Sequence, residues 1–294
     1  MKKNFPFLLS AFVILLAAVL FSCSHKTPEA VPTPEELVRQ QLGAIYGRYH
    51  ENAGGWFIRP PDECDDAEAE TDCDSFDVWP ESNESDYLMT VKQIDRKDIP
   101  EGNADGWQGE RFYVQVTGVK GGAAQVEPGL LGYFLYEMRN GKLELVGGLP
   151  YIYDGEAGHP YANVGLVKLS DDGYWAWYVE KSTRYASPNW TVILGPQEGK
   201  VVPLLELVTS FSFLREEARD RRGDDCFPYA TELEADILID DSVKNRKLYP
   251  LKATASGRLR GKKIRTRTVI LHFDEKKREY SHPKNWPLDD IKIW

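Results

Sequence analysis

The chain has 294 residues, of which 42% are hydrophobic and 28% are charged. These fractions are ordinary for a globular protein and exclude an intrinsically disordered chain. The charge is uneven, with 19 Lys and Arg against 41 Asp and Glu in residues 23–243, but 15 against 5 in residues 244–294. Because the basic residues follow a strand pattern, we expect the basic tail to pack beside the acidic body and neutralise it, and an interaction surface is the alternative.

The N-terminal segment has the layout of an export signal. Lys2 and Lys3 precede an uncharged stretch, Leu8 to Leu20, that is too short to span a bilayer comfortably. The stretch ends in Leu20-Phe21-Ser22-Cys23, which resembles the lipobox of bacterial lipoproteins. The resemblance implies that Cys23 is lipidated and becomes the mature N-terminus. A non-cleaved anchor and an ordinary secretory signal are the alternatives.

The same resemblance implies a location and a domain plan. A cysteine that carries two or more acyl chains holds a protein stably at a membrane, so we expect a lipid-anchored protein of the bacterial cell envelope. Ser24, rather than Asp, follows Cys23, which implies the outer membrane. The plan is a signal peptide over 1–22, a tether over 23–32 and a β-rich periplasmic body over 33–294, with a possible sub-boundary near 215–230. Nucleic acid is not an expected partner of such a protein.

A helix is predicted where the body begins. Thr33 is a suitable N-cap, Pro34 suits the first helical position, and Glu36 stands where a capping box needs it. Apolar residues follow at near-helical spacing as far as Tyr49, so the helix is expected to run to about that residue. The turn residues 52–55 are expected to end it.

Residues 60–86 are rich in Asp, Glu, Ser and Pro and predict a long loop. Cys64 and Cys73 enclose eight residues, and an oxidising compartment would favour a disulfide between them. Cys226 is then left over, as a buried thiol or as a partner of one of the other two, and spacing does not decide. No metal is expected, because the loop has neither a glycine nor the Asp-x-Asp-x-Asp-Gly pattern of calcium loops.

The rest of the chain has the pattern of strands separated by turns. The Asn140-Gly141 turn is the clearest hairpin signal, because both residue types tolerate positive φ. Such regular spacing predicts a mainly β fold with one N-terminal helix, as an antiparallel meander, a sandwich or an open barrel. The expected strands are 87–94, 112–119, 133–137, 143–146, 164–169, 174–179, 191–194, 201–207, 232–239, 248–260, 264–273 and 278–281. Apolar residues within 204–218 also fit one face of a helix, but residues 209–213 alternate and have poor helix propensity, so a strand through Phe213 is favoured.

A basic hairpin near the C-terminus is the candidate binding surface. Its cations alternate along two expected strands joined near Gly261, and period-two spacing places one strand's set on one face. If both sets share a face, they would bind an anionic envelope component or an acidic protein partner. The alternative is an edge hairpin that its charges keep soluble. The six residues are Arg258, Arg260, Lys262, Lys263, Arg265 and Arg267.

The sequence holds no catalytic signature: Gly-x-Ser-x-Gly, His-Glu-x-x-His, Cys-x-x-Cys and phosphate-binding glycine loops are all missing, and no cofactor is expected. The loop with Asp154, Glu156 and His159 is the one place to look for a catalytic site. Residues 174–178 put aromatics on both faces of one strand, for which burial is favoured over a sugar-stacking platform. We therefore expect a non-catalytic binding, scaffold or inhibitor module of unknown partner. The alternative is an envelope hydrolase acting on a glycan or an ester.

Overall fold

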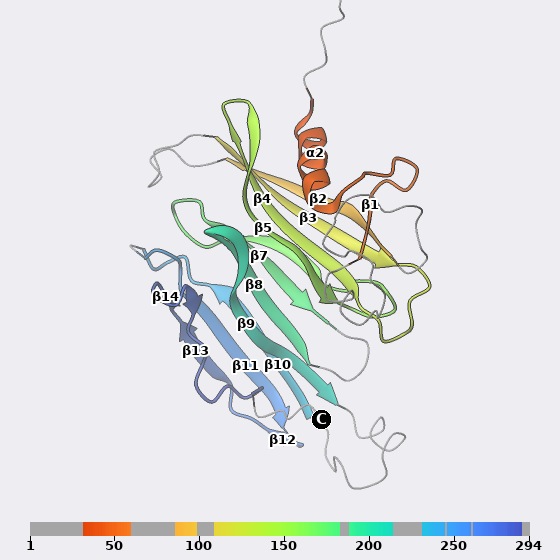
Figure 1. Cartoon of the computed structure of the whole chain (residues 1–294). Helices are drawn as coiled ribbons and strands as arrows, with labels where there is room; N and C mark the ends of the chain where they lie inside the picture. Colours follow the sequence, from red (N-terminus) through yellow and green to blue (C-terminus); the bar gives the residue numbers. More distant parts are fainter. Residues whose placement is uncertain are drawn as a thin grey trace, which may run out of the picture.

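The computed structural model describes residues 32–59, 86–98, 109–182, 188–213, 231–244, 246–259 and 261–289. These residues form a mainly β fold with one helix, as the sequence predicts (Figure 1). The helix is α2 (Pro34–Tyr46). The strands are β1 (Trp56–Ile58), β2 (Tyr87–Asp98), β3 (Glu110–Lys120), β4 (Gly129–Arg139), β5 (Lys142–Asp154), β6 (Asn163–Lys168), β7 (Trp175–Lys181), β8 (Asn189–Gln197), β9 (Gly199–Phe213), β10 (Thr231–Ile239), β11 (Leu251–Leu259), β12 (Lys262–Lys263), β13 (Arg267–Leu271), β14 (Phe273–Asp274) and β15 (Glu279–Tyr280).

Helix α2 begins as its sequence predicts. The Glu36 N–H donates to Thr33 Oγ1 at 3.2 Å, and the Glu36 carboxylate accepts the Thr33 N–H at 2.7 Å, so the capping box is complete. The expected end near Tyr49 is wrong by one turn. Gly47 adopts a φ of 81° and leaves the helical path, a conformation that glycine reaches without steric cost.

Strand β9 joins the parts of the sheet. Strands β1 to β5 form an antiparallel meander, and β6, β7 and β8 form a second one that ends on β9. At its start β9 also pairs with β5, in parallel, and at its end it pairs with β10. Gly147 permits the parallel contact, because a Cβ there would lie only 2.8 Å from the Lys200 carbonyl oxygen. The sheet therefore continues from one meander to the other through a single strand.

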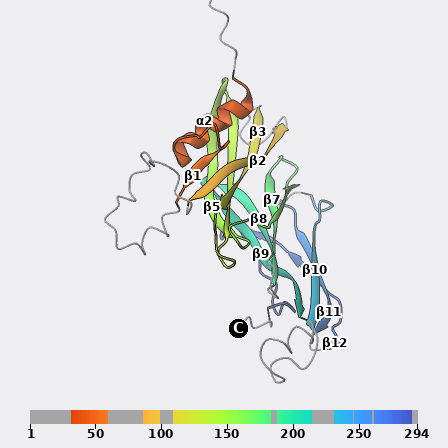
Figure 2. The same cartoon turned by 90° about the vertical axis from the view of Figure 1, so that its right-hand side faces the viewer.

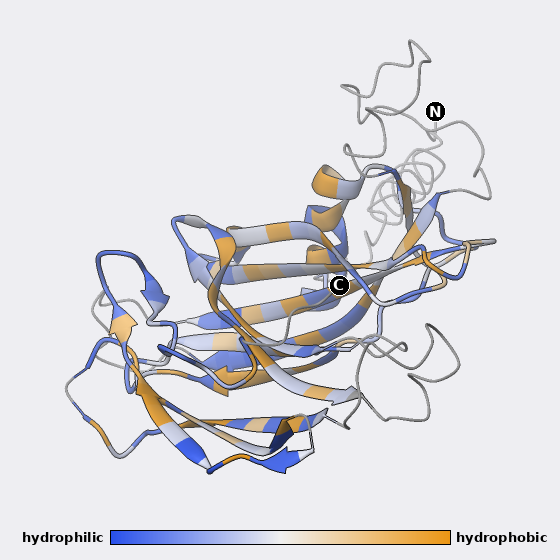
Figure 3. Cartoon of the chain, turned by 90° about the horizontal axis from the view of Figure 1, so that it is seen from below, coloured by the Kyte–Doolittle hydropathy of each residue, from blue (hydrophilic) through white to orange (hydrophobic). Residues whose placement is uncertain are grey.

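The curl of the sheet creates three hydrophobic clusters. Helix α2 lies against the meander β1–β5 (Figure 2), and its Val38 and Leu42 belong to the same cluster as Trp56 of β1. The other face of β3 and β4 packs against β7 and β8, where Trp177 contacts the rings of Tyr113 and Tyr133. A third cluster lies between the meander β7–β9, the strands β10, β11 and β13, and the C-terminal segment. Figure 3 shows how apolar and polar residues are distributed along the strands: buried and less buried residues alternate along β10 and β11, whereas β4 is buried over most of its length.

Most expected hairpins are confirmed, with one turn displaced. Asn140 and Gly141 have φ values of 51° and 73° and close β4 onto β5. The β8–β9 hairpin turns at Glu198 and Gly199, since Gln197 pairs with Lys200, so β8 continues to Gln197 beyond the expected end at Leu194. The expected strand through Phe213 is confirmed. The short strand β1, which pairs with β2, was not expected from the sequence because it follows directly on turn residues.

Several expectations concern residues outside the described part of the chain. These are the signal peptide and tether with Cys23, the acidic loop with Cys64 and Cys73, Cys226, Arg260, and the possible sub-boundary near 215–230. The strands on either side of that last segment, β9 and β10, pair with each other.

Candidate binding groove

A groove opens where β9 and β10 part. The two strands pair from Thr231 and Phe213 as far as Glu234 and Ser210, and no described residue of β9 pairs with β10 beyond that point. A register shift between β8 and β9 falls at the same place, between Asn189 and its neighbour Trp190. After the shift β9 follows β8, while β10 continues along β11. The space between them is a groove of about 420 Å³.

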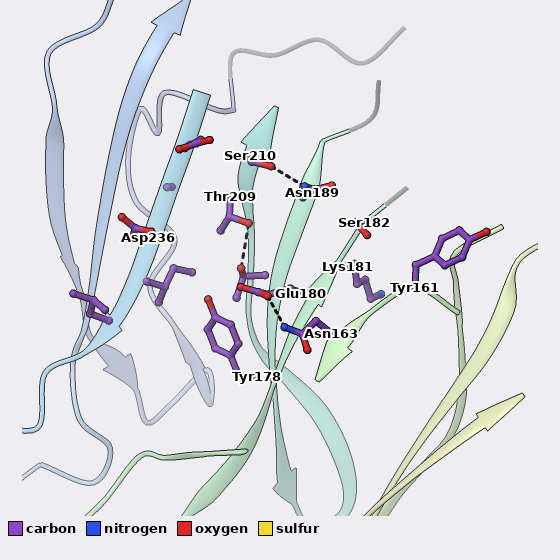
Figure 4. A pocket seen from close by; sticks show the side chains of 15 residues that line it. Tyr161, Asn163, Tyr178, Glu180, Lys181, Ser182, Asn189, Thr209, Ser210 and Asp236 are labelled. Atoms are coloured by element: carbon purple, nitrogen blue, oxygen red, sulfur yellow. Dashed lines mark hydrogen bonds between the residues drawn. The ribbon is translucent and has the colours of Figure 1, made fainter. Parts of the chain in front are cut away.

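The wall formed by β6 to β9 is a ladder of polar side chains (Figure 4). Asn163 Nδ2 donates to the Glu180 carboxylate at 3.0 Å, because these residues lie opposite each other on β6 and β7. Farther along the wall, Thr191 Oγ1 donates to Thr209 Oγ1 at 3.1 Å. Asn189 Nδ2 donates to Ser210 Oγ at 2.8 Å in the same region. These bonds hold the hydroxyl, amide and carboxylate groups of the wall in fixed positions.

The opposite wall is the edge of β10 from Glu234 to Leu238. Glu234, Asp236 and Leu238 are exposed, whereas the Ile237 side chain is buried in the core. Glu180 and the two acidic residues of β10 give the groove three carboxylates, and Lys181 is its one cation among the described lining residues. The groove therefore carries a net negative charge.

Tyr178 lies where the polar ladder meets the apolar core. Burial raises the pKa of its phenol, the hydrogen bond with the Thr191 side chain lowers it, and the charges of Glu180 and Asp236 raise it again. Tyr178 is therefore a neutral hydroxyl beside an aromatic ring. Together with Tyr161 at the other side of the groove, it offers ring surface to a bound molecule.

The loop that holds Asp154 and His159 serves to place Tyr161. Asp154 Oδ2 accepts the backbone N–H groups of Tyr161 and Ala162 at 2.7 and 2.8 Å, and its side chain is buried. Burial raises the pKa of Asp154, and the two backbone hydrogen bonds oppose that rise. His159 is exposed and pairs with Glu156 in an isolated bridge. Asp154, Glu156 and His159 are not among the residues that line the groove.

The basic hairpin does not present its described cations on one face. Arg258 and Lys263 are directly opposite each other and share the outward face. Lys262 pairs with Leu259, on the other face, and Arg267 pairs with the buried Ala255. Arg267 donates to the carbonyl oxygens of Lys284 and Asn285 and thereby fastens the C-terminal segment to the sheet. Arg265, which lies between β12 and β13, is exposed.

The outward face around Arg258 also carries acid. Glu232 of β10 lies directly opposite Arg258, and Glu234 lies opposite Ser256 on the same face. Carboxylates, rather than further described cations of the hairpin, therefore lie beside Arg258 and Lys263. The charge asymmetry along the sequence is therefore reduced where the acidic and basic strands pair.

Both faces of the aromatic strand of residues 174–178 pack into hydrophobic clusters, and Tyr178 also borders the groove. Trp177 is 2% exposed and packs into the cluster between the two meanders, while Ala176 is fully buried on the opposite face. Trp175 remains partly exposed under the Lys97 ammonium, 4.6 Å from the ring centre. Burial thus accounts for most of this aromatic surface, as expected.

The groove was not predicted from the sequence, because the pairing of strands, and not the spacing of residues along the chain, brings its residues together. Its polar residues come from five strands and from the segments just before β6 and just after β7, which lie far apart along the chain. One local signal was available: Thr209 and Ser210 are two adjacent polar residues within β9. They stand where β9 leaves β10.

Within the described ranges, no cluster of His, Cys, Asp and Glu is placed to hold a metal ion. The same ranges contain no helix with the length and apolar character needed to cross a bilayer. Comparisons with protein-family models, with curated proteins and with solved structures each gave no match to this chain.

Proposed function

We propose that the chain is a lipid-anchored envelope protein whose groove between β9 and β10 binds a polar ligand without transforming it. The observation that carries the proposal is the groove itself. Its volume of about 420 Å³ lies within the range of ligand sites, which is about 300–1,000 Å³. Its walls hold hydrogen-bonding groups in fixed positions beside two tyrosine rings. Such a combination suits binding and orientation of a polar molecule.

The lipid anchor is the second part of the proposal and rests on the lipobox resemblance at Cys23. An anchor would hold the groove near the membrane surface, where ligands of the envelope are concentrated. A Cys23→Ser variant is therefore expected to leave the membrane fraction. If this variant still sediments with membranes, the proposed lipid anchor at Cys23 is wrong, and the proposal reduces to ligand binding by the groove.

The binding test compares ligand classes and groove variants. The purified protein is applied to arrays of glycans and of peptides, alongside an Asn163→Ala, Asn189→Ala double variant that removes two polar groups of the wall. A Thr254→Ala, Thr268→Ala double variant is the matched control, because these hydroxyls bond to each other at an exposed site away from the groove. Binding that the groove variant loses and the control keeps supports the proposal. Binding unaffected by the groove variant contradicts it.

The alternative function, hydrolysis of a glycan or an ester, would use a carboxylate or histidine of the loop at 154–159. There, Asp154 accepts two backbone N–H groups and His159 is exposed outside the groove. The observations favour the binding module for that reason.

A further inference from the structure

The edge of β10 that faces the groove offers backbone hydrogen-bonding groups. The Asp240 N–H donates to the Pro250 carbonyl at 2.9 Å, so even-numbered residues of β10 direct their backbone groups to β11. In an antiparallel pair the bonding direction alternates from residue to residue. Ile237 therefore directs its N–H and C=O away from β11 and toward the groove.

The pairing of β10 with β9 agrees with this alternation. Leu233 and Phe211 lie opposite each other inside the paired stretch, which continues only one residue farther, to Glu234 and Ser210. By the same alternation, the backbone N–H and C=O of Ile237 would bond to β9 if β9 continued alongside β10. Among the described residues no strand does so, and an edge of this kind is a template for another strand.

The groove cannot be closed by β9 as it stands. The Val208 carbonyl accepts the indole N–H of Trp286 at 3.0 Å, and Val208 pairs with Trp190 of β8 on the other side. The carbonyl of Val208 is thus occupied by Trp286 and is not available to β10. The groove lies between the polar ladder and the edge of β10.

The charge of the groove indicates what kind of strand fits. Glu180, Glu234 and Asp236 line it, against the one cation Lys181. Glu234 and Asp236 are two residues apart on one face of β10, which is the spacing of alternate side chains on a facing strand. Because Glu234 lies opposite Ser210 of β9, a basic side chain of an added strand would lie opposite Asp236 and diagonal to Glu234.

We propose that the ligand of the groove is an extended polypeptide with basic side chains, which adds as a strand to the edge of β10 at Ile237. This inference rests on the proposed function, since it names the ligand class of the same groove. Backbone hydrogen bonds to β10 supply sequence-independent affinity, and the carboxylates select for basic residues. The polar ladder of β6–β9 contacts the far side of the added strand.

The probe is a six-residue peptide of alternating lysine and threonine, blocked at both ends, and its glutamate counterpart is the control for charge. Binding is measured at several salt concentrations, because exposed charge pairs are screened by salt. A version of the lysine peptide with every backbone nitrogen methylated keeps the charges but cannot donate to β10. We expect the lysine peptide alone to bind, and its methylated version to bind about tenfold more weakly or not at all.

Two protein variants separate the edge from the charge. A Glu234→Gln, Asp236→Asn variant removes the two carboxylates of β10 and is expected to weaken binding about three- to tenfold. Glu232→Gln is the matched control, because it lies on the same face of β10 but outside the groove. Amide hydrogen exchange in the complex is expected to show new protection at Ile237.

The outcomes bear on two proposals: strand addition to β10, and the binding of a polar ligand in the groove. Binding of the lysine peptide with protection at Ile237 supports both. Equal binding of the fully methylated peptide, or binding without protection at Ile237, overturns strand addition. Groove-dependent binding of glycans, with no peptide bound, overturns strand addition and leaves the proposed function standing. If neither class binds in a groove-dependent way, the proposed function fails as well.

Discussion

The indole N–H of Trp286 donates to the backbone carbonyl of Val208 at 3.0 Å. These residues are 78 positions apart, and the contact brings the C-terminal segment against the middle of β9. Trp286 is fully buried in the cluster beneath β9, β10 and β11. The C-terminal segment thereby takes a hydrogen bond that a neighbouring strand would otherwise make, and β9 stays apart from β10.

Replacing Trp286 by Phe tests this contact. Phe retains most of the apolar surface but has no donor, so the partly buried Val208 carbonyl loses its partner. The loss is expected to lower the free energy of unfolding by about 1–3 kcal/mol, measured by urea denaturation. Trp175→Phe is the control, since Trp175 is partly exposed. Equal effects of the two substitutions would mean that the hydrogen bond contributes nothing.

Asp154 should give the stability a pH dependence in the acid range. Burial raises the pKa of its carboxyl above the ordinary value of 3.8, and both of its N–H partners bond to the same oxygen, so the other oxygen is available for a proton. The native state therefore binds this proton more tightly than the unfolded chain does. The contribution of Asp154 is present in full below pH 3.8 and is lost as the pH rises through the raised pKa.

The Asp154→Asn variant provides the comparison, because Asn resembles the protonated carboxyl and its oxygen can accept the same two N–H groups. We expect wild-type protein to lose stability relative to this variant as the pH rises from 3.8 through the acid range. Urea denaturation at a series of pH values measures the difference. A difference that stays constant, or that changes in the opposite direction, would refute the assignment.

Glu137 should be the most sensitive carboxylate of the first meander. It is 1% exposed, and it accepts from Arg111 at 2.7 Å and from Arg139 at 2.5 Å. Glu137→Gln removes the charge that both guanidinium groups share, and the expected loss of unfolding free energy is about 2 kcal/mol. Glu144→Gln is the matched control, because exposed Glu144 only approaches Arg139 at 3.8 Å, and it should cost less than about 1 kcal/mol. The prediction fails if both variants unfold at the same urea concentration.

Arg267 is expected to act in structure rather than in binding. It donates to the carbonyls of Lys284 and Asn285, next to Trp286. Arg267→Ala should therefore loosen the C-terminal segment and lower the unfolding free energy by about 1 kcal/mol. Exposed Arg265 is the control, and Arg265→Ala should leave stability unchanged. Limited proteolysis near the C-terminus is the second measurement; equal cleavage of the two variants would contradict this role.

The sequence predicts the elements of this fold better than their junctions. The capping box at Thr33 and the Asn140-Gly141 turn are local signals, and both are confirmed. The helix end at Gly47 and the turn at Glu198 depend on φ values that residue type alone did not decide. The parallel contact between β5 and β9, at Gly147, joins strands 52 positions apart and has no local signature.

The candidate groove, like these junctions, depends on contacts between strands that are distant in the sequence. Asn163 and Glu180 become neighbours only when β6 pairs with β7, and Asp236 reaches the groove only because β9 leaves β10. The basic hairpin failed to form one cationic face for a similar reason. Alternation along each strand was predicted, but the relative register, which places Arg267 opposite Ala255, was not.

Amide hydrogen exchange of the free protein, followed residue by residue along β10, shows whether the edge of β10 at the groove is open. We expect rapid exchange at Ile237, whose N–H faces the open groove, between slow exchange at Asp236 and Leu238, whose N–H groups face β11. Equal protection of all three amides would mean that this edge of β10 is already paired, and the groove would then have no free strand edge to offer a ligand.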